Sequence, residues 1–162
     1  MITVDFEKTL RDLENYHKEV KRKLEFMVVG FSYLVAETAI SKTPLGDARV
    51  YASWYLDRKI ETGLRDEEGF AQGSWQVSTT GEFKRQEHYG SSAGDQALGL
   101  IKPAMNNYQL GQPVYIGNNA YYIGNLENNY SPQTFGLGIV APTTAQIMAT
   151  YQVELKRLFE KG

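Results

Sequence analysis

Few side chains in this sequence are of the types that carry chemistry. There are two histidines, His17 and His88, and no cysteine. Neither histidine has a second ligand at a spacing such as His-x-x-x-His, so we expect no metal and no cofactor. The absence of cysteine excludes disulfides. The sequence contains no Gly-x-Ser-x-Gly nucleophile elbow and no Gly-x-x-x-x-Gly-Lys phosphate loop. These observations favour a protein that is not an enzyme.

Glu127 needs an explanation, because it is the sole acidic residue between positions 96 and 150. As a catalytic residue it would be a general acid of the kind that glycosidases use. That chemistry requires a second carboxylate, and this region supplies none. The structural interpretation, which we favour, is that Glu127 accepts hydrogen bonds from backbone amides or from an arginine and thereby holds a loop in place.

Asparagines and tyrosines around Glu127 permit a carbohydrate-binding alternative, since aromatic rings stack on sugars and amides bind hydroxyl groups. The candidates are Tyr115, Asn118, Asn119, Tyr121, Tyr122, Asn125, Asn128, Asn129 and Tyr130. The competing interpretation is that asparagine at these places supports turns and positive φ angles.

The composition predicts one folded domain spanning residues 1–162. A hydrophobic fraction of 42% argues against disorder, and a net charge of −2 gives no electrostatic reason to bind nucleic acid or an anionic membrane. The longest uninterrupted apolar run, residues 26–31, is far shorter than the roughly 20 residues of a bilayer span. Residues 1–5 do not resemble a secretory signal. We therefore expect no membrane association.

Charge is spread unevenly along the chain. Residues 1–42 hold seven basic and seven acidic side chains, whereas residues 96–150 hold only Lys102 and Glu127. Depletion of charge together with aromatic residues is typical of subunit interfaces. A buried sheet with polar turns is the alternative explanation, and the two are compatible.

A long helix is predicted at the start of the chain. Its apolar positions recur in alternating steps of four and three, with His17 in one slot: Phe6, Leu10, Leu13, Val20, Leu24, Met27, Phe31 and Leu34. This near-heptad spacing predicts one helix that ends before Pro44. Residues 26–40 should belong to the core, whereas residues 5–25 should project and lie against another subunit, or against their own domain. Leu13, Val20 and Leu24 are the candidate interface residues of the projecting part.

The remaining elements are predicted to be shorter. Strands are expected within residues 73–80 and 114–116, and short helices within 48–65 and 120–127. Asp95 is expected to cap a helix that Pro103 kinks or divides, and Thr143 or Thr144 to cap a last helix. The fold class is α+β, with a long N-terminal helix, a small antiparallel β-sheet, short helices and a C-terminal helix.

Several short motifs follow one another in a recognisable order. They are Thr43-Pro44, Gly73-Ser74-Trp75-Gln76-Val77-Ser78, Val114-Tyr115-Ile116-Gly117-Asn118-Asn119, Tyr122, Leu126-Glu127 and Ser131-Pro132-Gln133. This order resembles the neck or tail-completion proteins, the head–tail connectors, of tailed bacteriophages. The sequence departs from that family in three places, one of which is the Ser-Pro-Gln-Thr-Phe-Gly loop of residues 131–136, where the family more commonly has a Gln-Ala-Pro form. Residues 45–72 look like an insertion before the Gly-Ser-Trp segment, and Asn129 stands where the family usually has glycine.

The resemblance implies a non-catalytic virion protein that forms a ring, as a hexamer, between the portal or neck and the tail tube. It implies three kinds of partner, namely further copies of the chain, portal or neck proteins, and tail-tube proteins. Phage DNA would pass through the lumen without specific binding, and no membrane would be involved. The protein would be made in the host cytoplasm and reside at the head–tail junction, as tail terminator or as adaptor. Its structural and interface residues would be Trp75, Asn118, Asn119, Tyr122, Leu126 and Glu127, and Asp66-Glu67-Glu68 would be a loop facing the lumen or a partner.

Two other functions stay open at the level of sequence. One is a carbohydrate-binding module or small glycan-active protein that uses Glu127 and the tyrosine–asparagine group. The other is an oligomeric scaffold protein of cellular origin.

Overall fold

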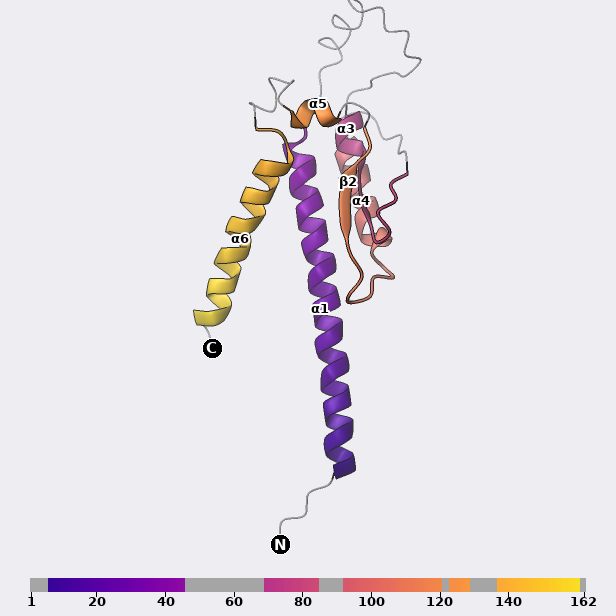
Figure 1. Cartoon of the computed structure of the whole chain (residues 1–162), viewed down its shortest axis with the longest axis vertical. Coiled ribbons are helices and arrows are strands. Elements are labelled where there is room, and N and C mark those ends of the chain that lie inside the picture. Colours follow the sequence, from indigo (N-terminus) through magenta and orange to yellow (C-terminus); the bar gives the residue numbers. More distant parts are fainter. Residues whose placement is uncertain (1–5, 46–68, 85–91, 121–122, 129–136, 161–162) are drawn as a thin grey trace, which may run out of the picture.

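The computed structural model describes residues 6–45, 69–84, 92–120, 123–128 and 137–160, without the side chains of Asn125 and of residues 154–160. The elements in chain order are α1 (Phe6–Lys42), α3 (Phe70–Gly73), β1 (Trp75–Ser78), α4 (Ala93–Ala104), β2 (Tyr115–Asn118), α5 (Ile123–Glu127) and α6 (Val140–Glu160). Figure 1 shows a long first helix beside a small α+β body, with α6 on its other side. The predicted α+β class is confirmed.

The amino-terminal half of α1 projects beyond the other elements (Figure 1), and every residue from 6 to 19 is exposed. Pairs of charges four residues apart stabilise the helix there, as Lys23 Nζ lies 2.7 Å from Glu19 Oε1. The hydrogen bond from Lys23 lowers the pKa of the Glu19 carboxyl. This pair therefore supports the helix at neutral pH, and its contribution is lost as the pH falls through the lowered pKa.

The carboxyl-terminal half of α1 has two apolar faces. One packs on the body, with Ser32, Ala36, Ala39 and Ile40 buried. The other apolar face continues the heptad spacing and includes positions 27 and 34. Each of these positions comes two residues before a core-facing position, 29 or 36. Two residues are about 200° around a helix, so the faces are nearly opposite.

The prediction that residues 26–40 are core is therefore correct for the face on the body and for the heptad positions Leu34 and Thr38, and wrong for the heptad face before them. On the heptad face, Met27 and Phe31 are 62% and 46% exposed, and Phe26 is 79% exposed beside it. An apolar circumference does not by itself bury a helix, because only the side in contact with other elements leaves water.

The core lies between α1, α4 and the two-stranded sheet. Its buried members include Ala36, Ala39, Ile40, Phe70, Trp75, Val77, Ala97, Ile101, Met105, Leu126 and Ile139. Strands β1 and β2 are antiparallel, with Trp75 opposite Asn118 and Val77 opposite Ile116. The buried residues of α1 and α4 include the small side chains Ala36, Ala39 and Ala97, which leave room for Trp75 and Val77 of β1.

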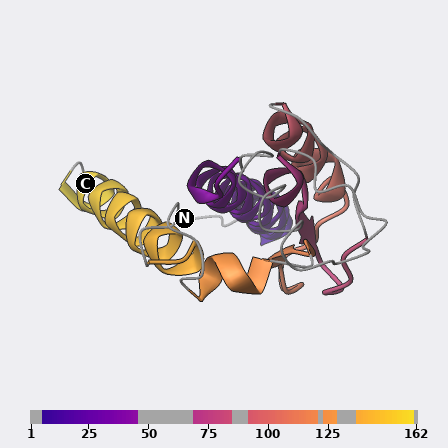
Figure 2. The ribbon, with the colours of Figure 1, turned by 90° about the horizontal axis from the view of Figure 1, so that it is seen from above.

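Helix α6 packs its first turns against α1 and then diverges from it toward the C-terminus (Figures 1 and 2). Ile139, Thr143 and Ile147, at steps of four, are buried. The last ring contact with α1 is an edge-to-face pair of Phe31 and Tyr151, whose centroids are 6.2 Å apart.

Two predicted helix caps are wrong. Helix α4 begins at Ala93, so Asp95 lies within the first turn. Pro103 lies in the last turn, one residue before the helix ends, so it does not divide the helix. Helix α6 begins at Val140, so Thr143 and Thr144 lie inside it. The start of α6 could not be predicted from local sequence patterns, because the group that caps this helix belongs to a different element, as described below.

Other predictions lie outside the described residues or only partly within them. The helix expected within 48–65, the Asp66-Glu67-Glu68 loop, His88, Tyr121, Tyr122, Asn129, Tyr130 and the Ser131-Pro132-Gln133 loop are not described. Of the segment interpreted as an insertion, Phe70 and Ala71 are buried in the core as part of α3. The backbone N–H of Gly69 donates to the carbonyl oxygen of Leu45 at 2.7 Å. The chain thus returns at Gly69 to the point that it leaves at Leu45. The insertion itself stays a prediction.

Candidate functional site

The Thr-Pro and Gly-Ser-Trp motifs meet at the end of α1. The indole N–H of Trp75 donates to Thr43 Oγ1 at 2.7 Å, and the same hydroxyl donates to the carbonyl oxygen of Ala39 at 2.7 Å. Gln72 Nε2 donates to the carbonyl oxygen of Thr43 at 2.7 Å. Thr43 is 2% exposed. Hydrogen bonds in such a buried place are costly to lose, because an unpaired polar group retains its full desolvation penalty.

Asn118 joins the end of β2 to α3. Its side-chain Nδ2 donates to the carbonyl oxygen of Ala71 at 2.6 Å, and its Oδ1 accepts the backbone N–H of Ala120 at 2.9 Å. Asn118 therefore both ends the strand and fixes the chain that follows it. The neighbouring Asn119 is half-buried, and its Oδ1 accepts no hydrogen bond from the described residues.

Glu127 holds the start of α6. Its Oε2 accepts the backbone N–H of Ile139 at 2.8 Å and that of Val140 at 3.1 Å. These amides belong to the first turn of α6, where N–H groups have no partner within the helix and a negative charge is favourable. This is the arrangement that the structural interpretation of Glu127 predicted, with backbone amides rather than an arginine as the donors. Leu126, beside it, is buried in the core.

Gly138 permits the close approach of Glu127. Its φ is +68°, and an added Cβ would lie 2.7 Å from the carbonyl oxygen and 2.8 Å from Oε1 of Glu127. Sequence analysis did not single out this glycine, although its place just before a helix was a usable signal.

We expect Gly138→Ala to lower the free energy of unfolding by about 2 kcal/mol or more, because it combines an unfavourable φ with a steric clash. Urea denaturation followed by circular dichroism would measure the change. Gly99→Ala is the matched control, since an added Cβ there meets nothing within 4 Å. Equal stability of the two variants would contradict the assigned role of Gly138.

The structure gathers one group of the predicted site residues and leaves another apart. Trp75, Asn118, Leu126 and Glu127 lie together at the end of the body where α1 ends and α6 begins (Figure 1). We call this region the motif junction. Leu13, Val20 and Leu24 lie far from it on the projecting half of α1, and Tyr122 lies outside the described residues. Thr43 and Gln72 belong to the motif junction but were missed as site residues, because their partners are distant in sequence.

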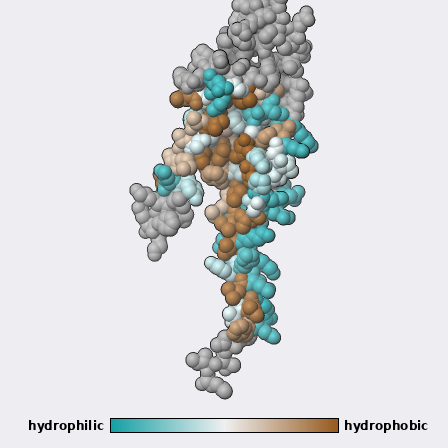
Figure 3. Space-filling view, viewed as in Figure 1, coloured by the Kyte–Doolittle hydropathy of each residue, from teal (hydrophilic) through white to brown (hydrophobic). Residues whose placement is uncertain are grey.

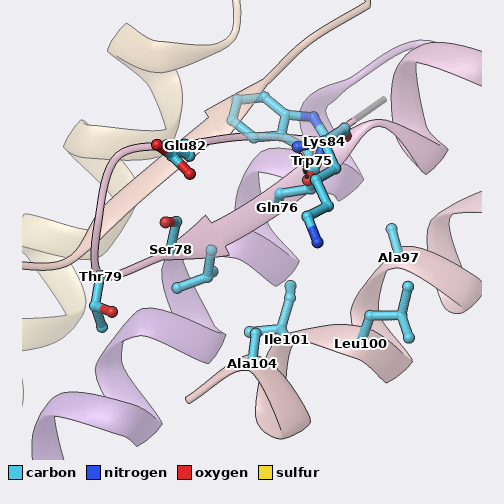
Figure 4. A pocket seen from close by; sticks show the side chains of 11 residues that line it. Trp75, Gln76, Ser78, Thr79, Glu82, Lys84, Ala97, Leu100, Ile101 and Ala104 are labelled. Atoms are coloured by element: carbon cyan, nitrogen blue, oxygen red, sulfur yellow. Dashed lines mark hydrogen bonds between the residues drawn. The ribbon is translucent and has the colours of Figure 1, made fainter. Parts of the chain in front are cut away.

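A cavity of about 430 Å³ lies between β1 and α4. Figure 4 shows that Ala97, Leu100 and Ile101 of α4 face β1 across it, and that the Lys84 side chain points into the space between them; Glu82 also lines the cavity. Gln76 closes one side by bonding both the N–H and the carbonyl oxygen of Lys84, at 3.0 and 2.5 Å. The cavity is lined neither by Glu127 nor by the asparagines of the carbohydrate alternative.

Some residues of the carbohydrate-binding alternative lie within the described part of the chain. The described residues contain no group of three or more histidines, aspartates or glutamates placed to hold a metal ion. Asn118 is engaged in structural hydrogen bonds, and Asn128 Nδ2 donates to the carbonyl oxygen of Gly124 at 2.7 Å. The ring of Tyr115 lies against Gly81. These side chains hold turns and loops, as the competing interpretation of the asparagines expected.

The apolar stripe of α1 is the most unusual surface that the structure describes. Figure 3 shows apolar residues running along one side of the projecting helix and polar residues along the other. The exposed members of the stripe are Phe6, Leu10, Leu13, Leu24, Met27 and Phe31, and Val20 is half-buried. A continuous apolar surface of this kind marks an interaction site in a folded protein.

By length and composition alone, α1 is also apolar enough to cross a membrane. A single helix of this kind is weak evidence for a membrane span, because a core helix of a soluble protein or a signal sequence can have the same length and apolar composition. The longest uninterrupted apolar run, residues 26–31, is too short to reveal this feature. The absence of membrane association stays a prediction.

Comparison of the chain with protein-family models, with curated proteins and with solved structures finds no match.

Proposed function

We propose that this chain is a structural, non-catalytic subunit of the head–tail junction of a tailed bacteriophage. Copies of it form a ring, as a hexamer, between the portal or neck and the tail tube, and DNA passes through the lumen without specific binding. The protein is made in the host cytoplasm and acts in the virion. The order of the sequence motifs suggests this function, and the surface of the molecule supports it.

The observation that carries the proposal is the apolar stripe on the projecting half of α1. Phe6, Leu10 and Leu13 are 73%, 54% and 59% exposed. Each would gain roughly 1.5–3 kcal/mol if it were fully buried, so several of them together form a strong driving force for assembly. A ring subunit needs surfaces of this kind that neighbouring molecules cover.

The charge-poor segment, residues 96–150, provides a second surface. Among its described residues, several large apolar side chains are 41–65% exposed: Leu100, Leu110, Tyr115, Leu137, Val140 and Met148. Exposed apolar side chains in a segment that itself holds only two charged residues are typical of interface centres rather than of free surface. A closed ring uses two different surfaces of each subunit, and this segment and the stripe are the candidates.

Deletion of residues 2–22 is the experiment that tests the proposal. We expect the shortened chain to unfold cooperatively with near-normal stability, because residues 6–19 are all exposed. We expect it to form rings poorly with purified tail tubes, as judged by electron microscopy and by light scattering after size-exclusion chromatography. The intact chain should give rings with a mass near six times 18.3 kDa.

Two outcomes would contradict the proposal. One is an intact chain that stays monomeric with tail tubes and binds glycans, which would favour the carbohydrate-binding alternative. The other is a shortened chain that still forms rings as the intact chain does. Loss of cooperative unfolding in the shortened chain would show instead that its first residues belong to the core.

A further inference from the structure

The stripe on α1 has the pattern of a coiled coil over residues 6–31. In heptad terms the a positions are Leu10, His17, Leu24 and Phe31, and the d positions are Phe6, Leu13, Val20 and Met27. These 26 residues make nearly four heptads, which is the length at which such a pattern indicates helix pairing. The helix is continuous through the whole region.

The same stripe already receives a helix at its upper end. The next heptad positions, Leu34 and Thr38, are half-buried and buried, and α6 reaches the stripe at the contact of Tyr151 with Phe31. Beyond Tyr151, α6 diverges from α1 and leaves the lower stripe uncovered (Figure 1). The uncovered part therefore continues an existing helix–helix interface, and a second helix fits it best.

We propose that the uncovered stripe pairs with the same stripe of a second copy of this chain, with the two α1 helices antiparallel. In the register that we infer, the residue numbers facing each other add up to 37. Phe31 then faces Phe6 of the second copy, Met27 faces Leu10, Leu24 faces Leu13, and Val20 faces His17. All eight heptad positions are buried, and Phe6 of the second copy lies beside the Phe31–Tyr151 pair.

Charges beside the stripe favour this orientation. The e positions flank one another in an antiparallel pair, and they place Glu14 against Lys21 of the second copy twice, by symmetry. Within its own helix, Lys21 has only a distant contact, 4.0 Å from Glu25. A parallel pair would bring Thr9 to Glu14 and Tyr16 to Lys21, and would set the two His17 side chains against each other. Only the antiparallel pair brings opposite charges together.

This pair extends the proposed function without depending on it. Neighbours around a ring run in the same direction, whereas a twofold axis relates the two chains of an antiparallel pair. The pair is therefore the form of the free protein, in which the stripe is kept from water until neighbours at the junction replace the second copy.

Single cysteines test the orientation cleanly, because the chain has none of its own. We expect a mixture of Leu13→Cys and Leu24→Cys chains to form a disulfide-linked dimer on mild oxidation. Each variant alone should not, since two copies of residue 13 would lie about 16 Å apart along the axis. Asn15→Cys, on the opposite side of the helix, is the matched control and should not cross-link. Efficient cross-linking of either stripe variant alone, or none in the mixture, would overturn the proposal.

Charge reversal tests the register in the uncrosslinked protein. We expect Glu14→Lys and Lys21→Glu each to raise the dimer dissociation constant about tenfold, and the double variant to return it close to that of the native chain. Dilution series followed by light scattering would measure the constants. A double variant that dimerises as weakly as the single variants would overturn the register. Flotation of the native chain with phospholipid vesicles, without a dimer in solution, would show that a membrane occupies the stripe instead.

Discussion

Replacing Trp75 by alanine is expected to lower the free energy of unfolding by about 3–5 kcal/mol. Trp75 is 6% exposed and contacts the core that α1, α4 and β1 share. Alanine would leave a cavity there and would also remove the hydrogen bond to Thr43 Oγ1. For a domain of this size such a loss is a large part of the total stability. Urea denaturation followed by circular dichroism would measure it.

Two smaller substitutions separate packing from hydrogen bonding at this place. Trp75→Phe keeps an aromatic ring in the core but removes the N–H donor, so we expect a loss of about 1–2 kcal/mol. Thr43→Val removes the acceptor and leaves the buried indole N–H unpaired, which costs about 1–3 kcal/mol. The double variant should lose less stability than the sum of the losses of the two single variants, because both substitutions remove the same hydrogen bond. Strict additivity would show that the Trp75–Thr43 bond contributes nothing.

Glu127→Ala is expected to lower the free energy of unfolding by about 1–3 kcal/mol, because it leaves the amides of Ile139 and Val140 without their acceptor. The effect should be local. Exchange of these two amide hydrogens with solvent should accelerate, and so should exchange in the first turn of α6, while α4 stays protected. Hydrogen exchange followed by mass spectrometry or NMR would resolve the two helices.

Glu127→Gln is the matched variant, since it keeps one acceptor oxygen but removes the charge. We expect a loss smaller than that of Glu127→Ala, with the difference reporting the value of the hydrogen bonds alone. Unchanged stability of Glu127→Ala together with loss of a glycan-cleaving activity would overturn the structural role and restore the catalytic interpretation.

The Trp75 and Glu127 substitutions both fall at the motif junction, and they have different consequences for assembly. Loss of Trp75 affects the core itself, so assembly should fail because the subunit unfolds. Loss of Glu127 releases the start of α6, which contacts the second half of α1. The Glu127→Ala chain should therefore stay folded at low temperature and still show whether α6 must be held in place for rings to form.

How much could be predicted from the sequence differs from element to element. The end of α1 was predicted within a residue or two, because the apolar spacing along the helix and a proline after it are strong local signals. Both strands were expected close to where they lie, on the strength of their β-branched and aromatic residues. Helix α3, with only four residues, was not predicted, because it is too short to show a period.

The α+β class, the long helix with its heptad stripe, and the absence of cysteine chemistry could all be read from the sequence, since each of these depends on residue type and local spacing. Three features depend on tertiary contacts: Trp75 bonds to Thr43 across 32 positions, Glu127 rather than a threonine holds the start of α6, and the apolar second half of α1 has a buried face but leaves Phe26 and Met27 exposed. The physical reason is the same in all three cases. A distant segment supplies the partner of each group, and local periodicity carries no information about which segment returns to lie beside it.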